Sequence, residues 1–288
     1  ITLDVAERLR QSILRSYYRD VRRLKRRFTF DGVQEILGRV EKRLYKHVVR
    51  SYTKVNFSQK ILLKELYDAR EIVENKHNSL FIEELNDFIN KVRIFGFHFA
   101  TLDIRQDSRV HHKAFTQIVD DLLASGDTTF PKNYQRLSDE EQIDILSVVK
   151  GNIDPKILSD EMSIKTIESI YALKTIQQRN GERGANRYII SNNQTALNVM
   201  QTFAMLNLCG FENELPVDVI PLFETVEDLE NASDVMRTLY TNKTYRYHLS
   251  KRGNKQTIML GFSDGTKDGG YLMANWGIFK AKEALTKI

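Results

Sequence analysis

The stretch PVDVIPLFET, residues 216–225, decides the fold. Its apolar residues run almost without interruption to Phe223 and then stop at Glu224 and Thr225. So short and apolar a run is typical of a strand buried on both faces, as in a parallel sheet covered by helices. Thr225 suits a helix N-cap, because its hydroxyl can accept a hydrogen bond from the first helical turn. The stretch therefore predicts a buried strand that leads directly into a helix ending near Tyr240.

Three other segments share this apolar, β-branched or aromatic character and predict further strands. They are RIFGFHFATLDIR (93–105), RYIIS (187–191) and TIMLGF (257–262). Helical patterns lie between them: a capping box at 138–141, a periodic segment over 164–178, and a helix after 193 that closes at Gly210. Strand and helix therefore alternate, which predicts a parallel α/β arrangement, either an open sheet or a barrel.

The N-terminal part of the chain has a different pattern, with helical periodicity throughout. We therefore expect a helical region over 1–92, followed over 93–288 by an α/β region of about four parallel strand–helix units. Four such units are half of an eight-fold, TIM-type barrel. The pattern itself does not distinguish part of a barrel from an open sheet.

The composition is that of a globular protein: 41% of the 288 residues are hydrophobic and 28% are charged. The one cysteine, Cys209, excludes an internal disulfide and suits a reducing cytoplasm. No apolar run approaches the roughly 20 residues that span a bilayer, so we expect no membrane segment. The sequence begins without methionine and stops inside a helical pattern, so we expect it to be part of a longer protein.

Basic residues are concentrated in one helical segment, with nine between Arg8 and Arg27 against one acid, Asp20. A nucleic-acid interface is one interpretation of this charge. The other is an amphipathic helix whose apolar row is buried while the arginines, among them Arg10, are solvated or paired with acids. The apolar row recurs every three or four residues: Leu9, Ile13, Tyr17, Val21, Leu24 and Phe28. We expect the second arrangement and no nucleic-acid binding, and keep a basic helical nucleic-acid-binding or scaffold module as the non-enzymatic alternative.

Charged side chains follow the predicted strands: Arg105, Glu224, Asp264 and, in an apparent glycine-rich turn, Lys267. The carboxyl ends of parallel strands meet at one edge of a sheet, where ligands bind in such folds. Two carboxylates from separate strands can share a hard cation such as Mg²⁺ or Mn²⁺. An arginine or lysine beside them can hold a phosphate or carboxylate. The structural alternatives are a helix-capping role for Asp264, an ion pair for Arg105 and an ordinary surface position for Lys267.

At these positions the sequence resembles the phosphoenolpyruvate carboxylase family. The motifs LDIRQDS (102–108), VIPLFETVEDLENA (219–232) and GFSDGTKDGG (261–270) resemble the family signatures LDIRQ-x-S, PLFET-x-x-DL and Y-S-D-S-x-K-D, and they occur in the same order. The likeness extends over most of the chain. It departs from the family where Phe262 replaces tyrosine, Gly265 replaces serine and Asn192 replaces methionine.

The resemblance implies a helix-rich α/β barrel that depends on a divalent metal, Mg²⁺ or Mn²⁺. It implies the carboxylation of phosphoenolpyruvate with bicarbonate to oxaloacetate and phosphate, an anaplerotic reaction, in a cytoplasmic homotetramer. Carried over by motif, Glu224 and Asp264 ligate the metal and Arg105 holds substrate. Lys267 acts at the bicarbonate or carboxyphosphate site.

Two elements of the family's active site are missing from these 288 residues. The catalytic histidine of the family stands in a T-A-H-P-T motif, and no histidine here has that context. The glycine- and arginine-rich G-R-G-G loop is also missing. The resemblance therefore implies a central piece of a carboxylase that holds the metal-binding part of the site and is inactive alone.

Overall fold

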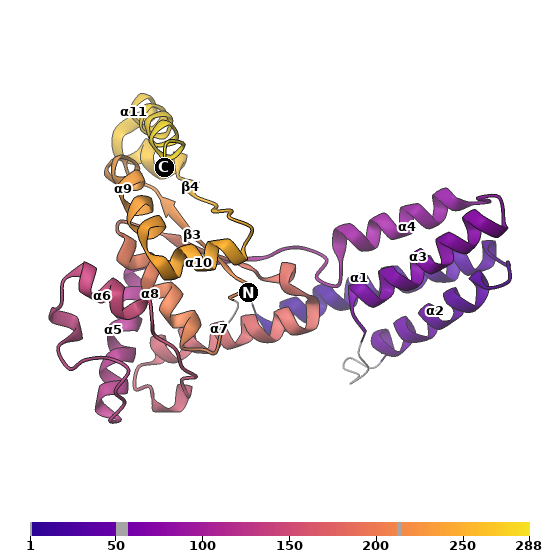
Figure 1. Cartoon of the computed structure of the whole chain (residues 1–288), viewed down its shortest axis with the longest axis horizontal. Helices are drawn as coiled ribbons and strands as arrows, with labels where there is room; N and C mark the ends of the chain where they lie inside the picture. The colour runs from indigo at the N-terminus through magenta and orange to yellow at the C-terminus, as the bar shows by residue number, and fades with distance from the viewer. Residues whose placement is uncertain (1, 50–56, 212–214) are drawn as a thin grey trace. The chain divides into compact units, whose positions relative to one another are not determined.

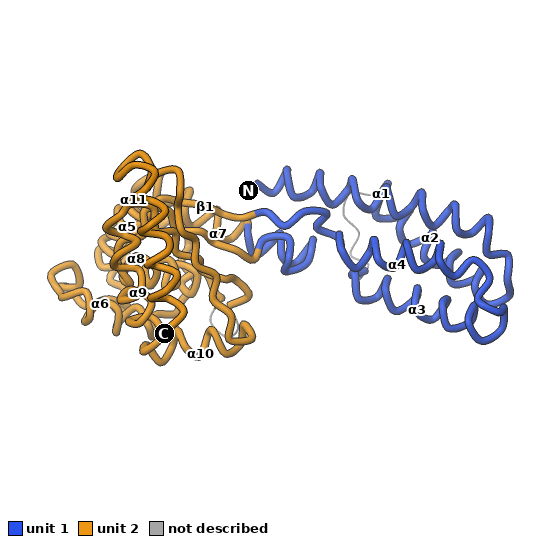
Figure 2. Tube along the Cα trace, turned by 90° about the horizontal axis from the view of Figure 1, so that it is seen from above, with its two compact units in different colours: residues 1–102, 173–185 blue, residues 103–172, 186–288 orange. Residues whose placement is uncertain are grey.

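The computed structural model describes residues 2–49, 57–211 and 215–288. The chain divides into two compact units (Figure 2). Unit 1 contains residues 1–102 and 173–185, and unit 2 contains residues 103–172 and 186–288. The chain therefore passes from unit 1 to unit 2, back to unit 1, and again to unit 2.

Unit 1 is built from long helices (Figure 1). They are α1 (Leu3–Arg27), α2 (Val33–Val49), α3 (Gln59–Lys76) and α4 (Ile82–Phe95), followed by the C-terminal part of α7 (Glu161–Asn180) and the 3₁₀-helix η3 (Glu182–Gly184). The side chains of Thr2 and Ser58 cap α1 and α3 by accepting hydrogen bonds from Val5 N and Ile61 N. Such caps satisfy backbone N–H groups that have no partner within the helix.

The apolar row of α1 is buried, which confirms the predicted amphipathic helix. Ile13, Tyr17, Val21, Leu24 and Phe28 are each at most 2% exposed and join one core cluster with α2, α3 and α4. Leu9 lies at the edge of this row and is partly exposed. The row recurs with helical period, so one stripe of the helix faces the other three.

Several basic residues of α1 and α2 pair with acids on neighbouring helices. Lys25 Nζ lies 2.9 Å from Glu41 of α2, and Arg43 lies 2.9 Å from Glu65 of α3. Others pair similarly: Arg22 with Glu41, and Arg27 with Glu84. Exposed pairs of this kind add little stability individually, but they neutralise part of the local basic surplus.

Arg10 is paired with an acid as expected, with Nη1 3.7 Å from Glu7 Oε1, but it is only 6% exposed. Its Nε donates a hydrogen bond to the carbonyl of Arg179, 3.2 Å away in the last turn of α7. A cation there satisfies a carbonyl that the helix leaves unpaired and complements the negative end of its dipole. Asn180 reinforces the junction by donating from Nδ2 to the carbonyl of Ala6 at 2.9 Å. The role of Arg10 depends on residues far along the chain, so periodicity did not reveal it.

Unit 2 contains four parallel strands in the order β1–β2–β3–β4 (Figure 1). They are β1 (Asp103–Asp107), β2 (Arg187–Ser191), β3 (Asp218–Phe223) and β4 (Met259–Leu260). The register pairs Arg105 with Ile189, and Ile189 with Ile220. This confirms a helix-rich α/β arrangement with parallel strands. As predicted, β2 and β3 are buried along most of their length, whereas β1 alternates between buried and exposed residues.

The connections in unit 2 are helical. The helices are α5 (Ser108–Ala124), α6 (Asp139–Leu146), the N-terminal part of α7, α8 (Ala196–Asn207), α9 (Val226–Thr241), α10 (Lys243–Lys251) and α11 (Phe262–Leu285), with the 3₁₀-helices η1 (Tyr134–Arg136) and η2 (Pro155–Ile157). Ser138 and Thr225 form the two predicted capping features, each completing a capping box with the residue three positions later. Residues 125–131 form a loop that is largely exposed, although Phe130 within it is buried.

Two predicted boundaries are wrong. Residues 93–102 do not belong to a strand, because α4 continues to Phe95 and β1 begins only at Asp103. Phe97, between them, is buried in the core of unit 1, and Tyr17 donates its hydroxyl hydrogen to the carbonyl of Gly96 at 2.7 Å. Aromatic composition signals burial as well as strand formation, and here burial is the cause.

The second wrong boundary is the expected glycine-rich turn after β4. Helix α11 begins at Phe262, and only Gly270 within it leaves helical geometry, with φ 81°. Gly261 is needed for close approach, since a Cβ there would lie 3.1 Å from Glu224 Cα and 3.2 Å from Phe223 O. Its own N–H donates to Phe223 O at 2.7 Å. The absence of a side chain at Gly261 therefore allows helix α11 to start directly against the end of β3.

None of the helices in the described part of the chain combines the length and apolar character that crossing a bilayer requires.

Replacing Gly261 by alanine tests this close approach. We expect Gly261→Ala to lower the free energy of unfolding by about 1–3 kcal/mol, because the added methyl overpacks the end of β3. Gly38→Ala in α2 is the control, since the nearest atom to its added Cβ is Lys25 Nζ at 3.9 Å. A glycine inside a helix with room for a methyl group makes the protein more stable by about 0.5–1 kcal/mol on this change. Urea unfolding that finds Gly261→Ala as stable as the parent would contradict the packing argument.

His111 should make stability depend on pH. Its ring lies 2.9 Å from Thr202 Oγ1 and 2.9 Å from Tyr188 Oη, and burial lowers its pKa to about 4. The unfolded chain takes up this proton near pH 6.5, so stability falls as the pH drops from about 6.5 towards 4. The parent loses stability between roughly pH 7 and pH 5. We expect this loss to be smaller by about 2 kcal/mol in His111→Gln. Urea unfolding at both pH values measures this loss.

The control for His111 is His112→Gln, one residue further along α5 and exposed. We expect it to keep the parent's loss of stability between the two pH values. Equal losses in all three proteins would show that His111 does not remain neutral in the folded chain.

Candidate functional site

An ion pair joins two strands of unit 2 at the predicted site. Arg105 Nη2 donates to Glu224 Oε1 at 2.9 Å. Arg105 lies in the middle of β1, and Glu224 directly follows β3, with β2 between these strands. The Glu224 side chain is 14% exposed, whereas that of Arg105 is 54% exposed. A largely buried carboxylate is thus paired with a guanidinium that remains accessible to solvent.

Backbone groups hold the Glu224 carboxylate in place. Its Oε2 accepts a hydrogen bond of 2.6 Å from the backbone N–H of Asn192, at the end of β2. Asn192 has a φ of 53°, a left-handed conformation that asparagine tolerates better than most residues. The backbone N–H of Glu224 donates to Asp228 Oδ2 at 3.2 Å, within the capping box of α9. Neighbouring strand and helix ends therefore fix both the backbone and the carboxylate of Glu224.

Asp264 and Lys267 form a second pair in the first turns of α11. Lys267 Nζ lies 2.8 Å from Asp264 Oδ1, with both side chains at least half exposed. The hydrogen bond and the charge of Lys267 lower the pKa of Asp264, and the charge of Arg105 lowers it further. The first turn of α11, which carries Asp264, starts against Glu224, since a Cβ at Gly261 would lie 3.1 Å from Glu224 Cα and one at Gly265 3.3 Å from Glu224 O. Asp264 does not cap the helix, because the N-cap position belongs to Gly261.

The structure thus brings together the four residues that the sequence analysis selected. Arg105, Glu224 and Asp264 meet at one end of the sheet, and Lys267 joins them through Asp264. The position of Lys267 differs from the expectation, because it stands on a helix and not in a turn. Position on a helix fixes its spacing from Asp264, since residues three apart are neighbours on a helix surface.

Two features of this end of the sheet were missed from the sequence. Arg109 at the start of α5 holds Asp107 at 2.7 Å and lowers the pKa of that carboxyl. The same arginine is influenced by the charge of Glu224, so a second guanidinium lies near the site. Asn193 is fully buried, and neither polar atom of its side chain has a hydrogen-bond partner. Arg109 could have been found as a cation following a strand, whereas the buried amide has no sequence signature.

The donor set fits a hard divalent cation. Mg²⁺ commonly binds through one or two carboxylates and completes its coordination with water and substrate oxygens. Glu224 and Asp264 supply such a pair, and Asp264 is half exposed. Across the described residues no cluster of three or more His, Cys, Asp or Glu side chains suits a metal. The closed ligand sets of structural zinc sites therefore do not fit here.

A family model described as phosphoenolpyruvate carboxylase matches residues 2–288 of this chain. The match includes the helices of unit 1 as well as the strands and site of unit 2. It therefore does not depend on the short motifs at the strand ends alone. The chain belongs to the phosphoenolpyruvate carboxylase family.

Proposed function

We propose that this chain provides the metal- and substrate-binding part of a phosphoenolpyruvate carboxylase active site. The reaction is the carboxylation of phosphoenolpyruvate by bicarbonate to oxaloacetate and phosphate. The observation that carries the proposal is the meeting of Arg105 with Glu224 at 2.9 Å, beside Asp264. Two carboxylates and accessible cations at one end of a parallel sheet are the groups that an anionic substrate and a hard metal need.

Arg105 is proposed to hold phosphoenolpyruvate. Its guanidinium is half exposed and offers paired N–H donors that match a phosphate or carboxylate. In the structure one of these donors is used by Glu224. A substrate oxygen can approach the donors that face solvent, so the arginine can orient substrate without moving far.

Glu224 and Asp264 are proposed to hold Mg²⁺ or Mn²⁺. A bound divalent cation stabilises the negative oxygen that develops as phosphoenolpyruvate loses its phosphoryl group. The N–H of Asn192 keeps the Glu224 carboxylate oriented, so one ligand position is preorganised. Asp264 is more exposed, and its partner Lys267 stands on the same helix.

Lys267 is proposed to act on bicarbonate or carboxyphosphate. Its ammonium group is 77% exposed and bound to Asp264. If Asp264 takes a cation as its partner, the ammonium group is released one helical turn away from it. A released cation can hold an anionic reactant close to the substrate, which favours reaction through proximity and charge stabilisation.

The family relationship also suggests the larger context. The consecutive order of four parallel strands suits one part of a TIM-type barrel. A homotetrameric parent protein and a cytoplasmic location, which the lone Cys209 suits, complete the proposal. The non-enzymatic alternative gains no support, because several basic residues of α1 and α2, among them Lys25, Arg27 and Arg43, pair with acids of neighbouring helices and so interrupt the basic surface.

Metal binding by the chain tests the ligand assignment directly. We expect Glu224→Ala and Asp264→Ala each to weaken Mn²⁺ binding by about tenfold or more, because affinity follows the number of charged ligands. Mn²⁺ titration followed by electron paramagnetic resonance measures this without any reaction. The control is Asp234→Ala, which removes an exposed carboxylate of α9 that lies 4.0 Å from Arg237. Equal weakening by Asp234→Ala would contradict the assignment.

We expect the 288-residue chain to bind metal but to produce no oxaloacetate above background. It lacks a histidine in the family's motif and the arginine-bearing loop, and such groups each contribute about 10²–10⁴ in rate. The assay couples oxaloacetate to NADH oxidation in the presence of phosphoenolpyruvate, bicarbonate and Mg²⁺ or Mn²⁺. Turnover that disappears in Asp264→Ala would show that the chain's own residues suffice for the chemistry.

A further inference from the structure

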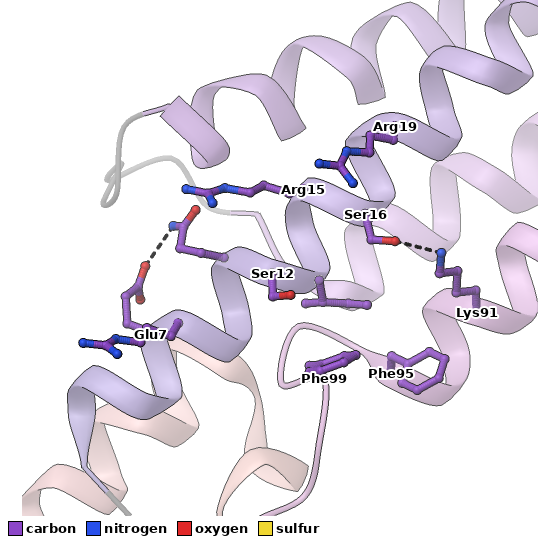
Figure 3. A pocket seen from close by; sticks show the side chains of 11 residues that line it. Glu7, Ser12, Arg15, Ser16, Arg19, Lys91, Phe95 and Phe99 are labelled. Carbon is purple, nitrogen blue, oxygen red and sulfur yellow. Dashed lines mark hydrogen bonds between the residues drawn. The ribbon is translucent and has the colours of Figure 1, made fainter.

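A groove in unit 1 has the composition of a binding site for an organic anion. It lies between α1 and the C-terminal end of α4 with the segment that follows it, and its volume is about 730 Å³ (Figure 3). Ligand sites for small molecules commonly occupy about 300–1,000 Å³. The side chains that line it include Arg15, Arg19, Ser12, Ser16, Phe95 and Phe99.

Arg15 and Arg19 form the cationic side of the groove. They stand four residues apart on α1, so their side chains lie on the same face of the helix. Both are exposed, and none of the ion pairs found among the described residues involves either one. By contrast, most other arginines of α1, such as Arg22 and Arg27, reach an acid. These two guanidinium groups therefore remain available to an anion from solution.

The other charged groups of the groove are already engaged. Lys91 Nζ lies 2.6 Å from Asp20 and donates to Ser16 Oγ at 2.8 Å. Arg8 is paired with Asp4 at 2.9 Å. The acid in the lining, Glu7, accepts from Gln11 Nε2 at 2.9 Å and lies at the far end from Lys91 in Figure 3. The free positive charge of the groove thus comes from Arg15 and Arg19.

The opposite side of the groove is aromatic. The ring centroids of Phe95 and Phe99 are 5.8 Å apart, with an angle of 35° between the rings. Figure 3 shows both rings at the lower side of the groove, across from the arginines. Phe99 is 39% exposed and has a φ of 64°, which is unfavourable for a bulky residue. An exposed ring held in an unfavourable backbone conformation is typical of functional positions.

We propose that this groove binds a phosphate monoester that carries a flat aromatic body. The phosphate oxygens accept hydrogen bonds from Arg15 and Arg19, whose planar donor pairs match them. The aromatic body packs against Phe95 and Phe99, because offset or edge-to-face ring contacts add stability beyond apolar burial. The hydroxyl of Ser12, between the two sides, serves as a further polar contact.

A small ligand fits better than a nucleic-acid strand. Binding along a phosphate backbone needs an extended row of free cations. Here the row of cations is interrupted beyond the groove, since Lys25 and Arg27 further along α1 are paired with Glu41 and Glu84. The inference does not rest on the proposed carboxylase function, because all lining residues belong to unit 1 and Arg105, Glu224 and Asp264 to unit 2.

Isothermal titration calorimetry of the 288-residue chain with phenyl phosphate tests the proposal. We expect Arg15→Gln combined with Arg19→Gln to weaken binding by about tenfold or more, through loss of the charge-assisted hydrogen bonds. The matched control is Arg22→Gln combined with Arg26→Gln, which removes the same charge from the same helix outside the groove. We expect the control to bind within about twofold of the parent.

Two further measurements separate the cationic and aromatic contributions. Ser12→Trp fills the groove without changing its charge, so we expect it to abolish binding while thermal unfolding confirms a folded protein. Inorganic phosphate should bind about tenfold or more weakly than phenyl phosphate, because it cannot use the rings. Adenosine 5′-monophosphate, compared with adenosine, shows whether a nucleotide is accepted: tighter binding of the phosphorylated form supports the proposal.

Three results would overturn it. These are no detectable binding of phenyl phosphate at millimolar concentration, equal weakening by both arginine pairs, and equal affinity for inorganic phosphate and phenyl phosphate. A further result would instead support a general electrostatic surface: strong, salt-dependent binding of random single-stranded DNA that both the Arg15/Arg19 variant and the Arg22/Arg26 control variant lose.

Discussion

The carboxylate of Glu224 is the charge on which the candidate site depends. A carboxylate that is 14% exposed is costly unless its charge and its hydrogen-bonding capacity are satisfied. Arg105 satisfies one oxygen from β1, and the N–H of Asn192 satisfies the other from the end of β2. Parts of three adjacent strands, the middle of β1 and the ends of β2 and β3, must therefore come together for this one group to be stable. The parallel pairing of the strands holds these parts beside one another.

The fourth strand and its helix follow from the same constraint. Space beside Glu224 is limited, and an added Cβ at Gly261 would come within 3.1 Å of its Cα. Gly265, one helical turn later, faces the Glu224 carbonyl just as closely, since a Cβ there would lie 3.3 Å from that oxygen. Two positions without side chains let α11 start against the end of β3, and Asp264 is carried on the turn between them. The glycines thus position a carboxylate, and their role is packing more than turn formation.

Much of this arrangement was predictable from local patterns. The buried strands around Ile189 and Ile220 were indicated by apolar runs, and the start of α9 by the hydroxyl of Thr225. The predictions that were wrong or incomplete concern residues whose partners lie far away in the sequence. Residues before Asp103 look like a strand because they are aromatic, yet their partners lie in the helices of unit 1. Arg10 looks like a surface residue, yet its partner is a carbonyl in α7.

The same distinction holds for the candidate site: local sequence patterns indicated some of its features and not those that depend on distant residues. Its four residues could be named because Glu224 and Asp264 follow recognisable apolar runs, Arg105 ends the strand predicted over 93–105, and Lys267 stands three residues after Asp264. The N–H of Asn192 that orients Glu224 could not, because a backbone donor leaves no trace in residue type. The helical start of α11 was also missed, since glycine and aspartate are both poor helix formers. Packing of α11 against β3 and α9 outweighs that local preference. Asp268 of α11 also accepts a hydrogen bond from the backbone N–H of Val226 in α9, at 3.1 Å.

The two charge pairs of the site differ in how firmly each carboxylate is held. On the proposed function, this difference links the binding of the metal to the binding of the substrate. The Asp264–Lys267 pair is exposed, and such pairs contribute only about 0–1 kcal/mol. A cation can therefore replace Lys267 at little cost. Glu224 is less accessible, and Arg105 can leave it only if the guanidinium finds another anion. On the proposed function that anion is the substrate, so substrate binding at Arg105 frees the second carboxylate for the metal. Substrate and metal then each strengthen the binding of the other, because the coupling between two binding sites is reciprocal.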